Sequence, residues 1–139
     1  MIVCGHKCVI IIQIEINKRD SHMCIFCKII KGEIPNNTVH ENENFLAFHD
    51  IYPKAPVHIV IIPKIHISCF QEVTPEIMAG MTAFIQEVTT KTGLDNTGFR
   101  LITNNGKDGG QEIYHLHFHL LGGGKLKWEY QHDNPHKSV

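Results

Sequence analysis

Three histidines stand at every second position in the stretch YHLHFHLLGG, residues 114–123. In an extended strand, alternate side chains point to opposite faces, so His115, His117 and His119 would share one face of a strand. A neutral imidazole nitrogen is a good nucleophile near pH 7, and neighbouring imidazoles can share protons and neutralise developing negative charge. The preceding loop, GKDGGQ, is rich in glycine, whose backbone N–H groups can approach an anion closely. The spacing therefore indicates a phosphate-facing surface and phosphoryl or nucleotidyl transfer through a histidine-bound intermediate.

The same three histidines have two other interpretations. Together they could bind a metal ion, since imidazole is the commonest zinc ligand in proteins. A single histidine in a strand is usually a surface residue or a hydrogen-bonded core residue, whereas three in register favour a shared function. Residues elsewhere in the chain have to decide between phosphate chemistry and metal binding.

Two strands and a short helix are predicted before the middle of the chain. An apolar turn of helix over residues 25–31 should stop at Gly32. The stretch NFLAFHD, residues 44–50, alternates like a strand, and VHIVIIP, residues 57–63, is a β-branched run of the buried type that ends at a proline. The stretch DIYPKAP between them is a loop punctuated by prolines.

One long helix and two more strands follow. Thr74 is the expected cap of the helix, Pro75 occupies its first position, and Gly93 follows its end. Residues 99–105 and 115–121 are expected to form strands joined by the glycine-rich loop. The apolar stripe of the helix consists of Ile77, Met81, Phe84 and Val88. These elements predict an α+β domain with an antiparallel sheet, one long helix and a short N-terminal helix.

Composition and charge limit the function classes. The chain has 139 residues, 42% hydrophobic and 19% charged, which fits one soluble globular domain. The formal net charge is −1 without a basic block, so nucleic acid and anionic membrane surfaces are not expected partners. The longest apolar run, CVIIIQ at residues 8–13, is too short to cross a membrane. Five cysteines, an odd number, do not fit a secreted disulfide framework and indicate a cytoplasmic location.

The first 22 residues differ from the remainder of the chain. They alternate, are rich in isoleucine and end in NKRDSH, after which MCIFCKIIKGEIP begins like a fresh start at Met23. We therefore expect a leader over residues 1–22, either appended or forming an extra strand. Residues 23–139 are expected to form a single domain with a C-terminal tail.

Four separated blocks of the sequence resemble one family. HLHFHLL matches the His-x-His-x-His-x-x motif of the histidine triad (HIT) family, in which x is apolar. CIFCKIIKGEIP, FHDIYPKAPVHIVIIPKIHIS and NNGKDGGQEIYHLHFHLLGG lie in the order and spacing of that family, so the resemblance covers roughly residues 23–130. LGGGKLKW, after the triad, is similar to the branch of purine nucleoside phosphoramidases. The resemblance implies a homodimer whose strands join into one continuous sheet, with a purine site on each subunit.

The resemblance assigns catalytic roles to four histidines. His117 would be the nucleophile that takes the nucleoside monophosphate, and His119 would bind the phosphate and help to manage protons. His115 would orient its neighbours through hydrogen bonds. His58, in APVH, resembles the fourth histidine, which supports the site from the next strand.

The resemblance also implies a nucleotide-binding set. Asp50 would accept the two ribose hydroxyls, although it could instead cap the following loop. Glu112 stands where many phosphoramidases of the animal type carry serine, which changes the expected preference among leaving groups. The purine slot would be lined by Ile25, Phe26 and Phe48, although the two phenylalanines could equally be core residues. The phosphate side would be formed by Asn104 and by the backbone of Gly110 and Gln111.

A structural zinc site and a dimer contact complete the expectations. Cys24 and Cys27 form a CxxC pair, the usual first half of a tetrahedral zinc site. With His66 and His115 they occupy four positions that bind structural zinc in some members of the family. In the resembling branch the segment after the triad crosses the dimer, so Trp128 is expected near the leaving-group pocket of the partner.

The function that follows is hydrolysis of the P–N bond of purine nucleoside 5′-phosphoramidates, with purine nucleoside monophosphate as the bound product. Two alternatives stay open at this point. A dinucleoside polyphosphate hydrolase or a nucleotidyl transferase shares the triad but departs from the tail LGGGKLKW. A nucleotide-binding scaffold with incidental hydrolysis is disfavoured by the intact His117.

Overall fold

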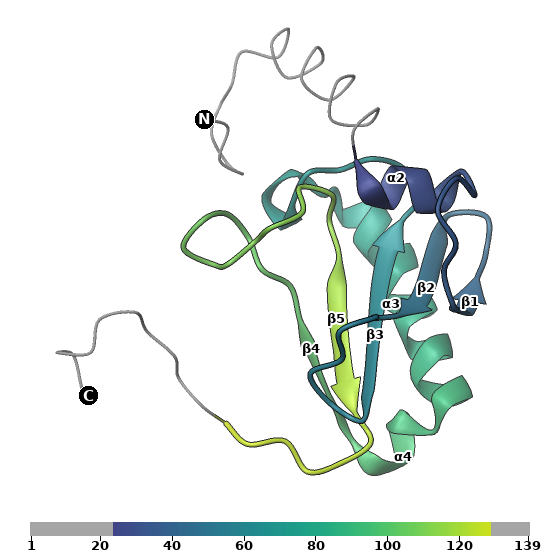
Figure 1. The fold of residues 1–139 in the computed structure, drawn as a ribbon, viewed down its shortest axis with the longest axis vertical. Helices are drawn as coiled ribbons and strands as arrows, with labels where there is room; N and C mark the ends of the chain where they lie inside the picture. The colour runs from purple at the N-terminus through teal and green to yellow at the C-terminus, as the bar shows by residue number, and fades with distance from the viewer. Residues whose placement is uncertain (1–23, 129–139) are drawn as a thin grey trace, which may run out of the picture.

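The structure, a computed structural model, describes residues 24–128, in which one five-stranded antiparallel sheet carries helices on both faces (Figure 1). The strand order is β1-β2-β3-β5-β4. In chain order the elements are α2 (Ile25–Ile30), β1 (Thr38–Glu41), β2 (Phe45–His49), β3 (Val57–Pro63), the 3₁₀ helix η1 (Phe70–Glu72), α3 (Pro75–Thr92), α4 (Leu94–Thr97), β4 (Phe99–Ile102) and β5 (Phe118–Gly122). The predicted α+β class, with an antiparallel sheet, one long helix and a short N-terminal helix, is confirmed.

The long helix α3 begins and ends where its cap residues stand. The Thr74 hydroxyl oxygen accepts a hydrogen bond from the backbone N–H of Ile77 at 3.3 Å, and Pro75 takes the first helical position. Gly93 ends the helix in the left-handed conformation, φ 77°, which glycine adopts without a steric penalty. The sequence prediction for this helix is therefore confirmed at both ends.

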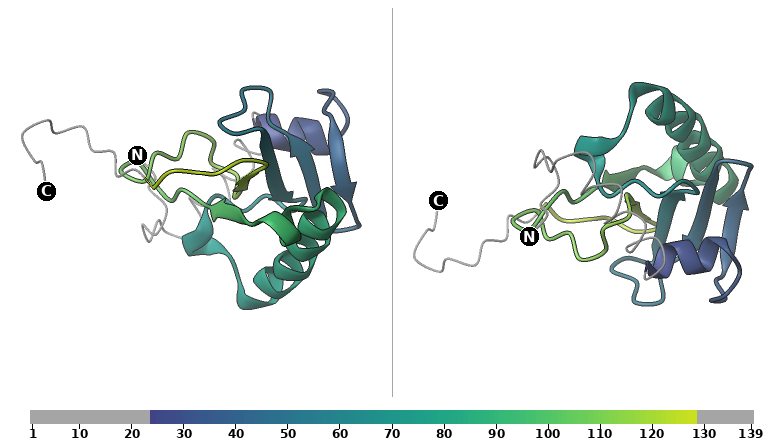
Figure 2. Two further views of the ribbon diagram at one scale, coloured as in Figure 1. Left: turned by 90° about the horizontal axis from the view of Figure 1, so that it is seen from below. Right: turned by 90° about the horizontal axis from the view of Figure 1, so that it is seen from above.

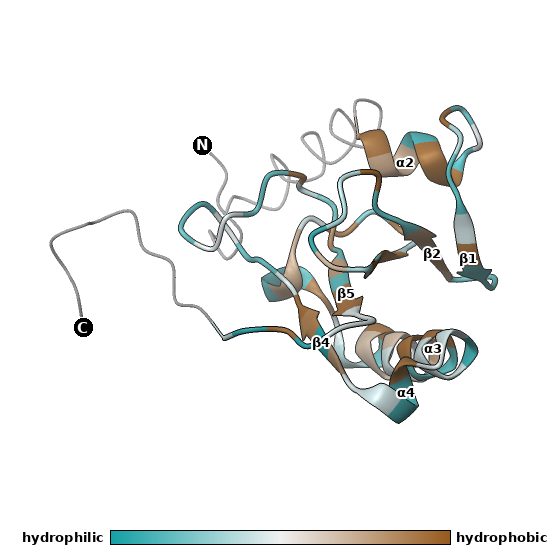
Figure 3. Ribbon diagram, turned by 60° about the horizontal axis from the view of Figure 1, so that its bottom comes forward, coloured by the Kyte–Doolittle hydropathy of each residue, from teal (hydrophilic) through white to brown (hydrophobic). Residues whose placement is uncertain are grey.

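Each face of the sheet buries its own apolar cluster. The two helices lie on opposite sides of the sheet (Figure 2), α3 over one face and α2 over the other. Strand β3 is buried on both faces, which explains the run of β-branched residues from Ile59 to Ile62. Figure 3 shows α2 as mostly hydrophobic and α3 as a mixture of hydrophobic and hydrophilic residues, because the outer side of α3 faces solvent.

The last strand is shorter than the sequence predicted. A strand was expected over residues 115–121, whereas β5 runs from Phe118 to Gly122. β4 ends at Ile102, whose partner is His119, and the segment before β5 turns to other contacts: the backbone N–H of Leu116 donates to the Ile67 carbonyl at 2.6 Å. The alternation of faces nevertheless persists, since Leu116, Phe118 and Leu120 all lie in the core cluster under α3.

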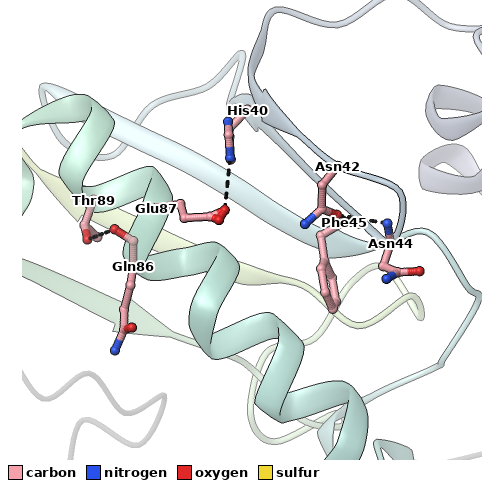
Figure 4. Close-up of polar contacts among 7 residues, drawn as sticks. All are labelled: His40, Asn42, Asn44, Phe45, Gln86, Glu87 and Thr89. Carbon is pink, nitrogen blue, oxygen red and sulfur yellow. Dashed lines mark hydrogen bonds and ion pairs between the residues drawn. The ribbon is translucent and has the colours of Figure 1, made fainter.

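Strand β1 was not predicted, because its sequence TVHE is short and half polar. It is held against α3 by His40, whose ring stacks on Phe84 with centroids 5.1 Å apart and whose Nε2 lies 3.5 Å from Glu87 (Figure 4). The turn into β2 is closed by the Asn42 carboxamide oxygen, which accepts the backbone N–H groups of residues 44 and 45 at 2.9 and 2.8 Å. Tertiary contacts therefore stabilise β1 where its own sequence pattern is weak.

Other predictions about the chain ends lie outside the described residues. These are the leader, residues 1–22, and all of the tail beyond residue 128. Within residues 24–128, none of the helices combines the length and the apolar character needed to cross a membrane.

Candidate functional site

A cavity of about 840 Å³ opens on the face of the sheet that carries α2. Its walls come from α2, from β2, β3 and β5, and from the loops that follow β2 and β4. Most of the predicted site residues line it, namely Ile25, Phe26, Phe48, Asp50, His58, Asn104, Gly110, Glu112, His117 and His119. His115, Gln111 and Trp128 do not line it.

His117 presents one ring nitrogen to this cavity with its lone pair free. Its Nδ1 lies 2.7 Å from the backbone carbonyl oxygen of His115, and a carbonyl can only accept, so the ring proton sits on Nδ1. The other nitrogen, Nε2, therefore carries the lone pair. Burial lowers the pKa of His117, which outweighs the opposing effects of the His115 carbonyl and of Asp50. The ring is thus neutral and nucleophilic near pH 7.

His58 and His119 form a hydrogen-bonded pair with defined tautomers. The backbone N–H of Lys54 donates to His58 Nδ1 at 3.0 Å, which leaves the ring proton of neutral His58 on Nε2. That Nε2–H donates to His119 Nδ1 at 2.9 Å. The proton of neutral His119 is consequently on Nε2, on the ring edge away from His58. His119 can therefore donate a hydrogen bond to a phosphate oxygen or to a leaving group in the cavity.

Asp50 lies beside this pair and holds its own loop. Its Oδ1 accepts the backbone N–H of Tyr52 at 2.8 Å, so the alternative that Asp50 caps the following loop is confirmed. Its Oδ2 lies 3.5 Å from His58 Nε2. The carboxylate also lines the cavity, so oxygen lone pairs stay available for a ligand, and the ribose contact remains a prediction.

The two phenylalanines expected at the purine slot belong to the core and also form a wall of the cavity. Phe26 and Phe48 meet edge to face with centroids 5.8 Å apart, and Phe26 also packs on the His117 ring at 5.2 Å. Both phenylalanines belong to the core cluster under α2 and also line the cavity. Ile25, at the rim, is 45% exposed. The cavity therefore has an aromatic, apolar wall next to His117, and the purine contact implied for it stays a prediction.

Gln111 works inside the glycine-rich loop. Its side chain accepts the N–H of Gly106 at 2.9 Å and donates to the carbonyls of Ser68 and Ile113 at 2.7 and 3.0 Å. Its backbone N–H donates to the Gly106 carbonyl at 3.0 Å. That N–H and the buried amide therefore both close the loop, and the phosphate contact implied for the Gln111 backbone stays a prediction.

The rest of the loop reaches the cavity through Asn104, Gly110 and Glu112. Gly110 adopts φ +80°, and its N–H donates to the Lys107 carbonyl at 3.0 Å. A side chain at Gly109 would place its Cβ 2.6 Å from the Asn105 carbonyl oxygen. Both glycines are therefore required by the tight path of the loop, and only Gly110 lines the cavity.

The two cysteines and two histidines expected to bind zinc lie together behind the triad. The ligand atoms of Cys24, Cys27, His66 and His115 all lie within 4.8 Å of one another. Sulfur-to-nitrogen distances are 3.3 Å for Cys27 to His66 and 3.5 Å for both cysteines to His115. Tetrahedral zinc with bonds of about 2.3 Å to sulfur and about 2.0 Å to nitrogen separates such ligands by about 3.5 Å. The cluster therefore has the dimensions of a zinc site.

The protonation states of His115 and Cys27 in this cluster also fit the binding of a divalent cation. His115 is fully buried, and its Nε2 donates to the Pro63 carbonyl at 2.8 Å, which leaves the Nδ1 lone pair directed at the cysteines. Burial and the neighbouring Cys24 raise the pKa of the Cys27 thiol to about 12. A cation is thus needed to hold that sulfur as the thiolate.

A second cluster of possible ligands, Asp50, His58 and His119, does not fit a metal. The two ring nitrogens are 2.9 Å apart, shorter than the separation of about 3.3 Å between nitrogens on tetrahedral zinc. Lys54 also fixes the His58 proton on the nitrogen that would have to bind the ion. This cluster is a hydrogen-bonded network.

Trp128 stands at the end of the described chain, away from the cavity of its own subunit. It is 84% exposed, and the guanidinium carbon of Arg100 lies 5.4 Å from its ring centroid. Arg100 also donates to the Lys127 carbonyl at 3.0 Å. The contact expected between Trp128 and a partner subunit stays a prediction.

Sequence reasoning missed three contributors to the site. The backbone N–H of Lys54 fixes the His58 tautomer, and the Thr103 hydroxyl donates to the His117 carbonyl at 2.8 Å. Ile51, 82% exposed, lines the cavity next to Asp50. The loop DIYPKAP lies between two predicted strands and carries Asp50, a signal that could have directed attention to Lys54 and Ile51.

Similar proteins share this chain's sequence over most of their own length. An uncharacterized HIT-like protein of Helicobacter pylori is 55% identical over 103 residues, which are 74% of this chain and 99% of the relative. The 14 kDa zinc-binding protein of Zea mays is 41% identical over 121 residues, 84% of this chain and 94% of the relative.

Solved structures agree with the fold. The HIT family hydrolase from Legionella pneumophila Philadelphia 1 has a TM-score of 0.72 at 45% identity, covering 76% of this chain and 96% of that one. The histidine triad nucleotide-binding protein from Candida albicans has a TM-score of 0.67 at 32% identity, and the match covers 80% of this chain and 86% of that one. The HIT domain family model matches residues 31–126. With His117 and His119 of the triad lining the cavity and His115 buried behind them, this chain belongs to the HIT family.

Proposed function

We propose that this protein binds purine nucleoside monophosphates and hydrolyses the P–N bond of purine nucleoside 5′-phosphoramidates through a nucleotide bound covalently to His117. The observation that carries the proposal is the free Nε2 lone pair of His117 inside the cavity, fixed by the 2.7 Å hydrogen bond from Nδ1 to the His115 carbonyl. A buried, oriented and neutral imidazole is the nucleophile that this reaction needs.

The reaction would take two steps at one phosphorus atom. In the first, His117 Nε2 attacks phosphorus and the amine leaves with a proton supplied by His119. In the second, water attacks the phosphorus and gives a proton back to His119 Nε2, the bond between phosphorus and His117 Nε2 breaks, and the nucleoside monophosphate is released. Covalent catalysis divides one difficult displacement into two easier ones. The Phe26 and Phe48 slot and Asp50 would hold the purine and the ribose, so the phosphorus meets the nucleophile in a fixed orientation.

Relatives support the class of reaction. The Legionella pneumophila structure is a HIT family hydrolase, and the Candida albicans structure is a histidine triad nucleotide-binding protein. The likeness of LGGGKLKW to phosphoramidases favours the P–N bond over the phosphoanhydride of a dinucleoside polyphosphate. Glu112 lines the cavity, which supports the proposal that its carboxylate accepts a hydrogen bond from the leaving amine.

We also propose that Cys24, Cys27, His66 and His115 hold a structural zinc ion, as the dimensions of the cluster and the zinc-binding Zea mays relative favour. The ion would connect α2 to the segment before β5, and it has no place in the chemical steps. Reduced thiols are required, which fits the cytoplasmic location expected from the cysteine count.

The active form is proposed to be a homodimer joined at β4. This strand is an edge of the sheet, and Phe99 and Leu101 on it are 45% and 40% exposed. An edge strand with exposed apolar side chains needs a partner to avoid uncontrolled pairing. Arg100 and Trp128 lie on the same side of the molecule, so a dimer at β4 would bring the start of the tail towards the partner.

The decisive experiment compares substrates at equal concentration. Adenosine 5′-phosphoramidate and diadenosine polyphosphate are each incubated with the purified protein and with the variant His117→Ala. We expect the phosphoramidate to be the better substrate. We also expect the variant to lose turnover while its affinity for adenosine monophosphate stays within about tenfold, because the ribose and purine contacts remain.

Three outcomes would redirect the proposal. Preference for diadenosine polyphosphate would favour the alternative hydrolase or transferase. Tight nucleotide binding with turnover no faster than in His117→Ala would favour a scaffold. Near-normal turnover by that variant would refute the assigned nucleophile.

A further inference from the structure

The Asp50 carboxylate lies beside the hydrogen-bonded pair of His58 and His119, close to the ring nitrogen Nε2 of His58. His58 Nε2 is hydrogen-bonded to His119 Nδ1 at 2.9 Å, and Asp50 Oδ2 lies 3.5 Å from the same nitrogen. The other carboxylate oxygen is fixed by the Tyr52 N–H at 2.8 Å. The position of Oδ2 beside His58 is therefore set by the loop itself, before any nucleotide binds.

Proton balance requires His119 to hold two protons when the amine leaves. As His117 Nε2 bonds to phosphorus, the P–N electron pair moves to the amine nitrogen, which takes the proton from His119 Nε2. A neutral His119 that gave up this proton would be left as an imidazolate, a very strong base. With a second proton on Nδ1, the same transfer leaves a neutral ring. His119 therefore has to be an imidazolium before it can act as the acid.

The resting hydrogen bonds oppose that second proton. A proton on His119 Nδ1 would face the Nε2–H of His58, and two donors cannot share a hydrogen bond. His58 cannot shift its own proton to Nδ1, because the Lys54 N–H already donates there at 3.0 Å. Within the described residues, 24–128, Asp50 Oδ2 is the remaining acceptor, 3.5 Å from His58 Nε2.

We propose that Asp50 is a positioning residue for proton donation by His119 and that it acts through His58. When His119 gains its second proton on Nδ1, it can no longer accept the Nε2–H of His58. Asp50 Oδ2 then accepts this N–H of His58 in its place. This role is separate from the ribose contact implied by the family resemblance, and it rests on the proposed phosphoramidase reaction. Asp50 would thus serve the leaving-group step as well as nucleotide binding.

Charges around His119 agree with this role. Burial, together with the nearby His117, His58 and Lys54, lowers the pKa of His119 to about 4, whereas Asp50 acts to raise it. Of the charged or titratable groups that act on this ring, Asp50 is the one that favours the imidazolium. Removal of the Asp50 charge should therefore lower the pKa of His119 and reduce the fraction of His119 that is an imidazolium.

A substrate without ribose hydroxyls separates the two roles. The full-length dimer or monomer, as purified, is assayed with adenosine 5′-phosphoramidate and with its 2′,3′-dideoxy analogue, using wild type, Asp50→Asn and the exposed control Asp95→Asn. Asparagine keeps the oxygen that caps the loop, so folding should be preserved. We expect Asp50→Asn to lower kcat on the dideoxy substrate by about tenfold or more, and Asp95→Asn to leave it unchanged.

Equal kcat values for wild type and Asp50→Asn on the dideoxy substrate would overturn the inference, because Asp50 would then act only through the ribose. If wild type cleaves neither substrate, the proposed function fails, and a direct titration still decides the inference. In nucleotide-free protein, the nuclear magnetic resonance titration midpoint of the His119 ring should move to lower pH in Asp50→Asn. An unmoved midpoint would overturn the inference in that case as well.

Discussion

Replacing one cysteine of the zinc cluster should lower the stability of the whole domain. Cys27 is the best position to change, because its sulfur lies 3.3 Å from His66 and 3.5 Å from His115, and its backbone N–H donates to the Cys24 sulfur at 3.4 Å. In Cys27→Ser the side chain keeps nearly the same shape, but a hydroxyl is a much weaker zinc ligand than a thiolate. The variant therefore tests the metal more than the packing.

The expected loss can be calculated from the linkage between binding and folding. At free zinc about 100 times the dissociation constant, binding stabilises the folded state by about 2.7 kcal/mol. A domain of about 100 ordered residues changes its Tm by about 4–8 °C per kcal/mol. Loss of the ion should therefore lower Tm by about 11–22 °C. Because α2 and the segment before β5 each supply ligands, the loss should affect the global unfolding transition.

The assay combines elemental analysis with thermal unfolding, with and without a chelator. Wild type should carry about one zinc per chain, and chelation should bring its Tm close to that of Cys27→Ser. His66→Gln should behave like Cys27→Ser, whereas the matched control His40→Gln, on the far face of the sheet, should retain zinc. Wild-type protein with reduced Cys24 and Cys27 but without zinc, or a chelator that leaves Tm unchanged, would refute the reasoning.

Two further predictions concern pH and the tail. Since burial lowers the pKa of His119 to about 4, the unfolded chain binds the extra proton between pH 6.5 and 4, so stability should fall over this window by at most about 3 kcal/mol as pH decreases. His119→Gln should show a flatter dependence of its unfolding free energy on pH, and an unchanged slope would contradict the shift. Deleting residues 126–139 should change the ranking of amine leaving groups more than it changes nucleotide affinity, because Trp128 is expected to shape the partner's site. Unchanged relative rates across several phosphoramidates would count against that contact.

Elements with strong local signals could be predicted from the sequence. VHIVIIP matches β3 at both ends, because a β-branched run stops where proline removes a hydrogen-bond donor. The caps Thr74 and Gly93 likewise fix α3. The start of β5 could not be predicted, since it depends on where β4 ends and on a contact from Leu116 to Ile67 that spans 49 residues of sequence.

In the candidate site, too, features with a local sequence signal could be predicted and features that depend on distant contacts could not. Residue types and their alternation identified the triad and the CxxC pair, and the fold places them as two adjoining sites that share His115. The tautomers could not be predicted, because they depend on individual donors such as the Lys54 N–H. The hydrogen bonds of the Gln111 side-chain amide could not be predicted either, because they depend on the path of the loop.

The central claim is a nucleotide bound covalently to Nε2 of His117, and rapid quenching tests it most directly. Wild-type protein is mixed with adenosine 5′-phosphoramidate, quenched within the first turnover under conditions that preserve N–P bonds, and analysed by peptide mass spectrometry, with His117→Ala as the control. We predict an adenylyl group on His117 that forms and decays at rates compatible with turnover and is missing from the control. Turnover by wild type without any adduct, or an adduct on His119 instead, would contradict the account.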